Sequence, residues 1–483
     1  MAPKKLSEYE RKRLENIRRN DEVMAALKIC SKVSQLSAAI KPQRVELTKS
    51  FKVGPEKRKP KLDSTNLIRR SLRTQGMPPD LTDSDVETPP PNQFHKFTGP
   101  ISMSDAYTGT HSDRPLIDTI LSLQRKPLGE FVLPIKKEID IKDGVLSFDC
   151  GIEIVKKEME ICMDLQSMKL KPENIARLMP GRITVVKFLP CNDVRMIAAG
   201  NETGNVAFWK LGSLGGDGDG IYLYRPHTAP ISGILFQQSC LSKIFTSSND
   251  GFVRMMNAEK EVFDQIYSSD NAILSLSQRP NDMNGLYFGE GRGGLRILDE
   301  RTGRISSQWM MHEDRINSID FNSQNPNVMA TASSDGTACL WDLRSVNAEK
   351  PNSLKIVKHN RAVHSACFSP SGSFLATTSA DDTVGIFNCA DFEDNSLIYH
   401  GRGVSSISFR CIWGWDDTYM YMGNTKRGVD VISRLQGRAI LTLESPYMSA
   451  IPCRYDIHPY NIGMLAGATA GGQVYMWTGH QYT

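Results

Sequence analysis

The sequence lacks the patterns that would indicate a disulfide framework, a metal site or a membrane anchor. Its ten cysteines are scattered along 483 residues, and no two of them form a Cys-x-x-Cys pair. Isolated cysteines of this kind are typical of small buried side chains in a reducing compartment. No apolar run approaches the ~18 residues of a membrane-spanning helix, and the charged N-terminus does not resemble a signal peptide. We therefore expect no cofactor and no membrane association.

What the sequence does contain is a repeated unit, which is clearest at residues 328–344. Two apolar segments flank a turn at Asp335-Gly336, and the second segment ends in Trp341-Asp342. Apolar segments on both sides of an Asp-Gly turn predict a pair of antiparallel strands. His312 lies about 16 residues upstream of this segment. A histidine, a hairpin and a final Trp-Asp pair are the parts of one WD40 propeller blade.

Weaker copies of this unit recur along residues 183–480, and together with the clearest one we count seven units. Their turns between the second and third strands lie at Thr203-Gly204-Asn205, Asn249-Asp250-Gly251, Gly291 to Gly294, Asp335-Gly336, Asp381-Asp382, Lys426-Arg427-Gly428 and Gly471-Gly472. A period of about 40–45 residues with four short strands predicts a β-propeller. The chain ends six residues after Trp477, so the last unit lacks a fourth strand. We expect residues 174–179 to supply it and to close the ring.

Charge is distributed unevenly along the chain. The net charge is only +4, yet residues 1–75 contain 20 lysines and arginines against 8 acidic residues. Within them, residues 6–29 read as an amphipathic helix with a capping box at Ser7 and Glu10, which could pack on the propeller or bind a partner's groove. We predict a basic, helical, largely disordered arm over 1–75. A linker and extension that packs on the propeller follows over 76–170, and an all-β seven-bladed WD40 propeller over 171–483.

The repeat also accounts for the residues that could be mistaken for a catalytic site. The glycine-rich segment 289–294 resembles a phosphate-binding loop, but no helix follows it, so we interpret it as a turn between strands. We expect His312, Asp335 and Trp341 to form a hydrogen-bonded set inside one blade rather than an acid–base pair. The sequence therefore predicts no catalytic residue and a protein that is not an enzyme.

Arginine recurs immediately before the predicted first strand of four units. These residues are Arg182, Arg315, Arg361 and Arg402. In a propeller, these connections emerge on the same face as the turns between the second and third strands, which adds Arg292, Lys426 and Arg427. Seven converging cations suit phosphate groups, and DNA backbone contacts are our first interpretation. An acidic or phosphorylated protein partner, or structural packing of the arginines between blades, remains open as an alternative.

The N-terminal motif Leu6-Ser7-Glu8-Tyr9-Glu10, the basic run at 69–73 and the propeller with basic turns together resemble the WD-repeat protein 76 family. That family includes the changed-mutation-rate DNA damage-binding proteins. The resemblance implies a nuclear propeller that binds DNA, with some preference for damaged DNA. A related protein wedges a hairpin into the duplex, but the hairpin has no clear counterpart here. We therefore expect binding that is led by the DNA backbone.

The resemblance also implies a role as substrate receptor of a cullin-4 ubiquitin ligase. Such receptors carry an adaptor-binding motif that resembles Asp335, Trp341, Asp342 and Arg344. Because any well-formed WD blade needs the first two residues and usually has the third, Arg344 carries most of this inference. The expected partners are double-stranded DNA, a cullin-4 ligase adaptor and chromatin proteins, and the protein is expected to be a nuclear monomer.

Overall fold

A computed structural model describes residues 97–124, 164–212, 219–237, 240–282, 284–346, 351–389 and 408–479, the backbone of 399–400, and Arg18. The chain divides into two compact units, residues 1–88 and 89–483, and all the described residues except Arg18 belong to the second. The helix expected over 6–29 lies outside the described residues apart from Arg18, which is helical.

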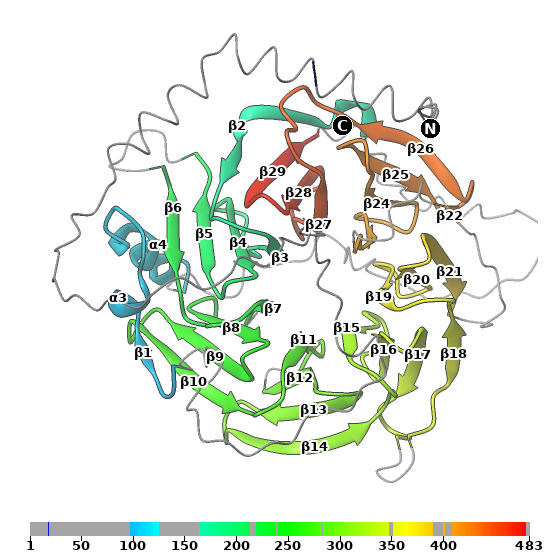
Figure 1. Ribbon diagram of the computed structural model, residues 1–483, viewed down its shortest axis with the longest axis horizontal. Coiled ribbons are helices and arrows are strands. Elements are labelled where there is room, and N and C mark those ends of the chain that lie inside the picture. The colour runs from blue at the N-terminus through cyan, green and yellow to red at the C-terminus, as the bar shows by residue number, and fades with distance from the viewer. Residues whose placement is uncertain are drawn as a thin grey trace, which may run out of the picture. The chain divides into compact units, whose positions relative to one another are not determined.

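The second unit is a seven-bladed propeller of antiparallel sheets, as predicted, and the blades surround a central axis (Figure 1). Blade one consists of β3 (Ile183–Phe188), β4 (Met196–Asn201), β5 (Val206–Lys210) and β6 (Ile221–Tyr224). Blade two consists of β7 (Ile231–Phe236), β8 (Lys243–Ser248), β9 (Phe252–Asn257) and β10 (Val262–Ser268). Blade three consists of β11 (Ile273–Gln278), β12 (Gly285–Glu290), β13 (Gly294–Asp299) and β14 (Arg304–Met310).

The remaining four blades follow in chain order. Blade four consists of β15 (Ile316–Phe321), β16 (Val328–Ser333), β17 (Thr337–Asp342) and β18 (Lys355–Lys358). Blade five consists of β19 (Val363–Phe368), β20 (Phe374–Ser379), β21 (Thr383–Asn388) and β22 (Tyr399–His400). Blade six consists of β23 (Ile412–Trp413), β24 (Tyr419–Gly423), β25 (Val429–Ser433) and β26 (Arg438–Leu443). Blade seven consists of β27 (Pro452–Ile457), β28 (Met464–Thr469), β29 (Gln473–Thr478) and, from before blade one, β2 (Lys169–Arg177).

Strand β2 closes the ring by pairing antiparallel with β29. Lys169 faces Thr478 and Arg177 faces Gln473, with an irregularity between Leu170 and Ile175. The predicted donor strand is therefore confirmed, although it begins five residues earlier than residue 174. Because β2 pairs with β29, blade seven has four strands although only three of them come from the end of the chain.

The turns between the second and third strands have the geometry that their sequences predict. Gly204, Gly251, Gly336 and Gly472 all have φ between 80° and 88°, a region that glycine adopts without strain. In blades five and six, Asp382 and Arg427 take up the left-handed conformation instead. These tight turns join the second strand of each blade directly to the third.

The core lies between adjacent blades, and small residues allow the blades to approach closely. All six residues of β4 are buried. A Cβ atom added to Gly200 at its end would lie 2.6 Å from the Ile231 side chain of the next blade. Gly289 meets Ile316 of blade four in the same way, at 2.9 Å. The second strand of one blade is thus packed closely against the innermost strand of the next blade, which fixes the positions of the innermost strands around the axis.

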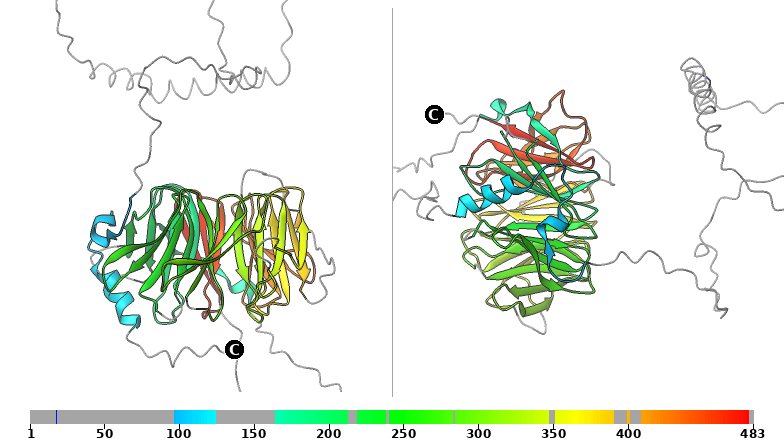
Figure 2. Two further views of the ribbon diagram at one scale, coloured as in Figure 1. Left: turned by 90° about the horizontal axis from the view of Figure 1, so that it is seen from below. Right: turned by 90° about the vertical axis from the view of Figure 1, so that its left-hand side faces the viewer.

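An extension before the propeller covers the outer edge of blades one and two, next to β6 and β10 (Figures 1 and 2). It comprises β1 (Ile101–Ser102), α3 (Met103–Ala106) and α4 (Arg114–Gln124), and a single 3-10 turn, η3 (Leu165–Ser167), precedes β2. Strand β1 pairs with β10, which makes the sheet of blade two five-stranded. Arg254 is fully buried beneath this segment and donates a 2.7 Å hydrogen bond to the carbonyl oxygen of Gly99.

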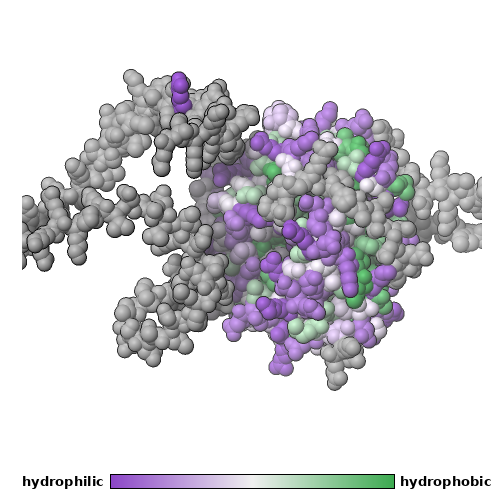
Figure 3. Space-filling model, turned by 45° about the vertical axis from the view of Figure 1, so that its right-hand side comes forward, coloured by the Kyte–Doolittle hydropathy of each residue, from purple (hydrophilic) through white to green (hydrophobic). Residues whose placement is uncertain are grey.

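One face of the described surface is mainly polar. On the face that Figure 3 shows, hydrophilic residues predominate and hydrophobic residues form separate small patches. Within the part of the chain that the structure describes, no helix is both long and apolar enough to cross a bilayer.

Candidate nucleic-acid interface

Six of the seven predicted DNA-contacting cations lie at loops of a single face of the propeller. Arg182 and Arg315 immediately precede β3 and β15, and Arg361 lies two residues before β19. Arg292 is in the β12–β13 turn, and Lys426 and Arg427 are in the β24–β25 turn. Because strands alternate in direction within a blade, its first strand begins on the face where its second strand turns into its third. We call these six residues the basic face.

Arg402, the seventh predicted contact, lies outside the described residues. The innermost strand of its blade, β23, begins at Ile412 rather than at residue 403. Arg402 therefore does not immediately precede this strand, and the repeated position that we expected in four units is shared by Arg182 and Arg315 alone. The sequence led to this error because no turn or Trp-Asp pair marks the start of the innermost strand in blade six.

Five members of the basic face are exposed, and Arg182 is partly buried. Arg315 donates from Nε to the hydroxyl of Ser334 at 2.9 Å, a contact with a neutral group. Among the described residues, no carboxylate lies within 4.0 Å of the charged groups of the basic face. These cations are consequently free of intramolecular charge partners within the described structure, so their positive field is directed toward solvent.

Two further arginines lie next to Arg182 at the axis and were missed by the sequence analysis. Arg454 is the third residue of β27, and Arg410 lies two residues before β23. Arg182 and Arg454 each donate from Nη2 to the hydroxyl oxygen of Ser408, at 2.9 and 3.0 Å. Arg410 donates from Nη2 to the carbonyl oxygen of Asn317 at 3.0 Å. We call Arg182, Arg410 and Arg454 the axial arginine cluster.

The charge of this cluster is evident in the titration of its neighbour His364, the second residue of β19. Burial and the fields of Arg410, Arg454, Arg315 and Arg182 lower the pKa of His364 to about 4. Burial, together with Arg454 and Arg182, lowers the pKa of Arg410 to about 9. At neutral pH the imidazole is therefore uncharged while the guanidinium groups remain charged.

The opposite ends of the innermost strands carry a different arrangement. Lys187 of β3 forms a 2.8 Å ion pair with Asp456 of β27, which also accepts a 2.7 Å hydrogen bond from the backbone N–H of Phe188. Asp320 of β15 accepts a 2.7 Å hydrogen bond from the backbone N–H of Phe368. Burial raises the pKa of Asp320 to about 6, and backbone hydrogen bonds from Phe368 and Phe321 and the charge of Lys187 oppose the shift.

Two of the predicted adaptor-binding residues, Asp335 and Trp341, form hydrogen bonds inside blade four. Asp335 contacts Nδ1 of His312 at 2.9 Å, and Nε2 of His312 lies 2.7 Å from the hydroxyl of Thr331. Trp341 donates from Nε1 to the same hydroxyl at 2.8 Å. His227 and Asp250 repeat the contact in blade two at 3.0 Å. The expectation of a structural hydrogen-bonded set is confirmed, and burial lowers the pKa of His312 although Asp335 opposes the shift.

The other two adaptor-binding candidates lie on the opposite face from the basic turns. Asp342 ends β17, which runs from the second turn of its blade to the far face. Arg344 is exposed and holds Asp342 through two parallel hydrogen bonds, Nε to Oδ1 at 3.0 Å and Nη2 to Oδ2 at 2.8 Å. This paired geometry is the stronger form of an arginine–carboxylate contact, and it fixes the guanidinium plane at the surface.

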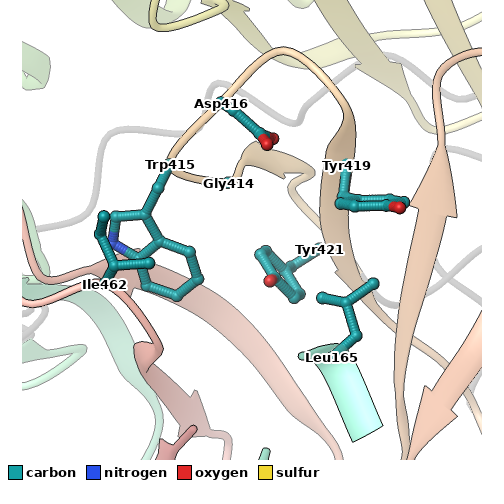
Figure 4. Close-up of a pocket in the computed structure, with 7 residues that line it drawn as sticks. All are labelled: Leu165, Gly414, Trp415, Asp416, Tyr419, Tyr421 and Ile462. Carbon is teal, nitrogen blue, oxygen red and sulfur yellow. The ribbon is translucent and has the colours of Figure 1, made fainter. Parts of the chain in front are cut away.

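The described residues line two hollows. One lies among Trp415, Tyr421, Ile462 and Leu165 (Figure 4), and its volume of about 10 Å³ has room for a single water molecule. It is too small for a substrate. A larger open hollow of about 530 Å³ lies beside Arg292 on blade three and includes Trp309 and the exposed Met310. This second hollow places apolar side chains next to the basic face.

Comparison with known proteins agrees with the repeats. The family model "WD domain, G-beta repeat" matches residues 304–342 and 352–388, which extend from β14 to β17 and from β18 to β21. With seven blades, these repeats define the chain as a WD40 propeller protein.

The resemblance drawn from the sequence is confirmed by relatives that match most of the chain. A protein named WD repeat-containing protein 76, from Xenopus laevis, is 27% identical over 84% of this chain and 69% of its own length. A DNA damage-binding protein CMR1 from Scheffersomyces stipitis is 28% identical over 98% of this chain and 99% of its own. One from Neurospora crassa is 25% identical over 99% and 100%. This chain is a homologue of these proteins.

Proposed function

We propose that this protein is a non-enzymatic, nuclear DNA-binding propeller that acts in DNA metabolism or the response to DNA damage. The observation that carries the proposal is the basic face, where five exposed cations and Arg182 share one side of the ring without a described carboxylate partner. The names of the relatives support the same ligand, since two of those cited are called DNA damage-binding proteins.

The chemistry of the basic face suits the sugar–phosphate backbone. Arginine presents a planar, permanently charged fork of donors to phosphate oxygens, and such contacts position a protein on DNA without reading its sequence. The basic face supplies five arginines and one lysine from blades one, three, four, five and six. Cations spread over several blades can follow a backbone that crosses the face, and the basic arm of residues 1–75 adds further charge for non-specific affinity.

Charge reversal on each face of the propeller tests this proposal. Arg315→Glu combined with Arg361→Glu should weaken binding of a fluorescent duplex by at least about tenfold, because two phosphate contacts become repulsive. Arg301→Glu is the matched control, since this exposed arginine lies in the β13–β14 turn on the opposite face. Equal losses from both changes would indicate a non-specific effect of net charge and would remove the interface from the basic face.

We propose as a second function that the far face binds an adaptor of a cullin-4 ubiquitin ligase. The observation that favours it is the exposed, fixed guanidinium of Arg344, which lies away from the basic face, so DNA and adaptor could bind together. Arg344→Ala should reduce co-purification of the adaptor and leave the melting temperature nearly unchanged, because the Arg344–Asp342 pair is exposed and contributes little stability. Loss of both together would assign Arg344 a structural role.

A further inference from the structure

The axial arginine cluster has neutral hydrogen-bond partners in place of the carboxylates that such a group requires. Two of its guanidinium groups share the hydroxyl of Ser408, and Arg454 also donates from Nε to the carbonyl oxygen of Thr184 at 3.0 Å. The Nε atoms of Arg182 and Arg410 are buried and have no hydrogen-bond partner among the described residues. Polar atoms that are buried and unpartnered raise the free energy of the fold, unless a ligand supplies what is missing.

Charge balance leads to the same conclusion. No described carboxylate forms an ion pair with the cluster, and the undescribed residues 401–407 before Ser408 contain Arg402 but no Asp or Glu. Like charges gathered in a partly buried site repel one another and lose hydration, and the loss is recovered only when an opposite charge binds. The ends of the same strands at Lys187 and Asp456 show that this fold can supply an internal carboxylate where one is needed.

We propose that the axial arginine cluster binds a phosphate monoester, specifically the phosphate at the end of a DNA strand. This inference rests on the proposed function, whose ligand it makes more specific. A monoester carries about −1.5 to −2 charges at neutral pH and three strong acceptor oxygens, whereas a carboxylate or a backbone diester carries one charge. Three guanidinium groups therefore match a terminal phosphate more closely than they match a phosphate within a strand.

The position of the cluster distinguishes the end of a strand from its interior. Arg410 and Arg454 are partly buried at the axis, whereas Arg315 and Arg361 are exposed on the same face. A duplex that lies across exposed cations leaves its internal phosphates at the surface, but a single-stranded end is slender enough to enter toward the axis. The surrounding basic face continues the positive surface along the rest of the strand, which favours DNA over a phosphorylated protein side chain.

His364 provides a probe that does not depend on DNA. The nearby arginines help to hold its pKa at about 4. Inorganic phosphate bound among them would cancel part of their field. The His364 pKa, followed by NMR in the full-length protein and assigned with His364→Gln, should then rise by at least about one unit in phosphate compared with chloride at equal ionic strength. An unchanged His364 pKa at saturating phosphate would overturn the proposal, and the titration itself is made on the original protein, with His364→Gln used only to assign the signal.

The DNA experiment compares partly single-stranded duplexes that differ only at the overhang end. Overhangs ending in a 5′- or 3′-phosphate should bind at least about tenfold more tightly than the same overhangs ending in hydroxyl, because Arg410 and Arg454 are engaged in addition to the basic face. Arg410→Gln should abolish the preference while retaining hydroxyl-ended binding, and Arg301→Glu should retain the preference. Melting curves check that Arg410→Gln is folded, and Arg410→Lys, which keeps the charge, should retain part of the preference.

These outcomes distinguish a failure of the strand-end inference from a failure of the proposed DNA-binding function. Equal binding of phosphate and hydroxyl ends would overturn the strand-end inference and leave the DNA-binding function intact. If neither end bound, the proposed function itself would fail. A phosphoserine peptide that raised the His364 pKa and bound tightly, while phosphate-ended DNA did not, would assign the cluster to a protein ligand and would also overturn the inference.

Discussion

The two ends of the innermost strands of this propeller differ in whether their charged side chains form ion pairs. At the ends where these strands finish, Lys187 is paired with Asp456, and Asp320 lies close enough to Lys187 for each to affect the titration of the other. At the ends where they begin, Arg182, Arg410 and Arg454 donate hydrogen bonds to neutral oxygens and pair with no carboxylate of the described residues. The first arrangement is complete within the fold, whereas the second requires an anion from outside. Charges that a fold leaves unpaired near its axis are thus better evidence for a ligand than charges in general.

The largest effect on stability is expected from removing the ion pair between Lys187 and Asp456. Asp456→Ala would leave the ammonium group of Lys187 and the backbone N–H of Phe188 without their partner. The free energy of unfolding should fall by about 3 kcal/mol. This value lies at the low end of the loss expected when one partner of a buried ion pair is removed, because the Lys187 side chain is half exposed. Urea unfolding followed by fluorescence measures the loss. A change below about 0.5 kcal/mol would mean that this end is no more internally satisfied than the other.

A somewhat smaller effect is expected from Asp320, whose pKa burial raises to about 6. In the unfolded chain the pKa is about 4, so the folded state binds the proton more tightly. The associated stability is fully present below pH ~4 and is lost as the pH rises through the folded pKa of about 6.

The Asn variant tests this linkage, because it keeps the acceptor for Phe368 but cannot ionise. Asp320→Asn should therefore be between about 2 and 3 kcal/mol more stable than the original protein at pH 8, and about equal to it at pH 4. Denaturant unfolding at both pH values measures the two differences. A variant that is destabilised equally at pH 4 and pH 8 would show that the carboxylate is not under strain from burial.

The smallest effect, and opposite in sign to that of Asp456→Ala, is expected at the unpaired end. Arg410→Gln removes one of three mutually repelling charges and should leave the protein equally stable, or more stable by up to about 1 kcal/mol, in a buffer without phosphate. Phosphate should stabilise the original protein more than this variant, because a ligand that binds the folded state raises its melting temperature. Clear destabilisation of Arg410→Gln in both buffers would make the cluster structural, and the contrast between the two ends would disappear.

Much of the fold could be predicted from the sequence because short local sequence patterns mark the strands and turns of a propeller blade. A Gly turn, a Trp-Asp pair and an upstream histidine mark blade four, and the other blades keep parts of this pattern, chiefly the turn between the second and third strands. The extension at 97–124 could not be predicted in the same way. Its strand has two residues and α3 has four, and both are held by contacts with β10 and β6 that have no local pattern.

The candidate site was predictable only where it lies in loops. Arg292, Lys426 and Arg427 occupy turns that the repeat places on one face, and Arg182 and Arg315 immediately precede strands whose start the repeat defines. Arg454 lies inside a strand, and Arg410 precedes the two-residue strand β23. Their approach to Arg182 depends on how blades one, six and seven meet at the axis. That meeting is a tertiary property, so the sequence alone did not show the cluster.

The central claim is that unpaired cations on one face of the propeller bind the DNA backbone. The measurement that tests it most directly is a titration of duplex DNA with the full-length protein at several salt concentrations. With about five phosphate contacts, log K should fall linearly with log salt with a slope between about −4 and −5, and Arg315→Glu with Arg361→Glu should make the slope shallower by about 2. Binding that is absent, or whose affinity does not change with salt, would contradict the account.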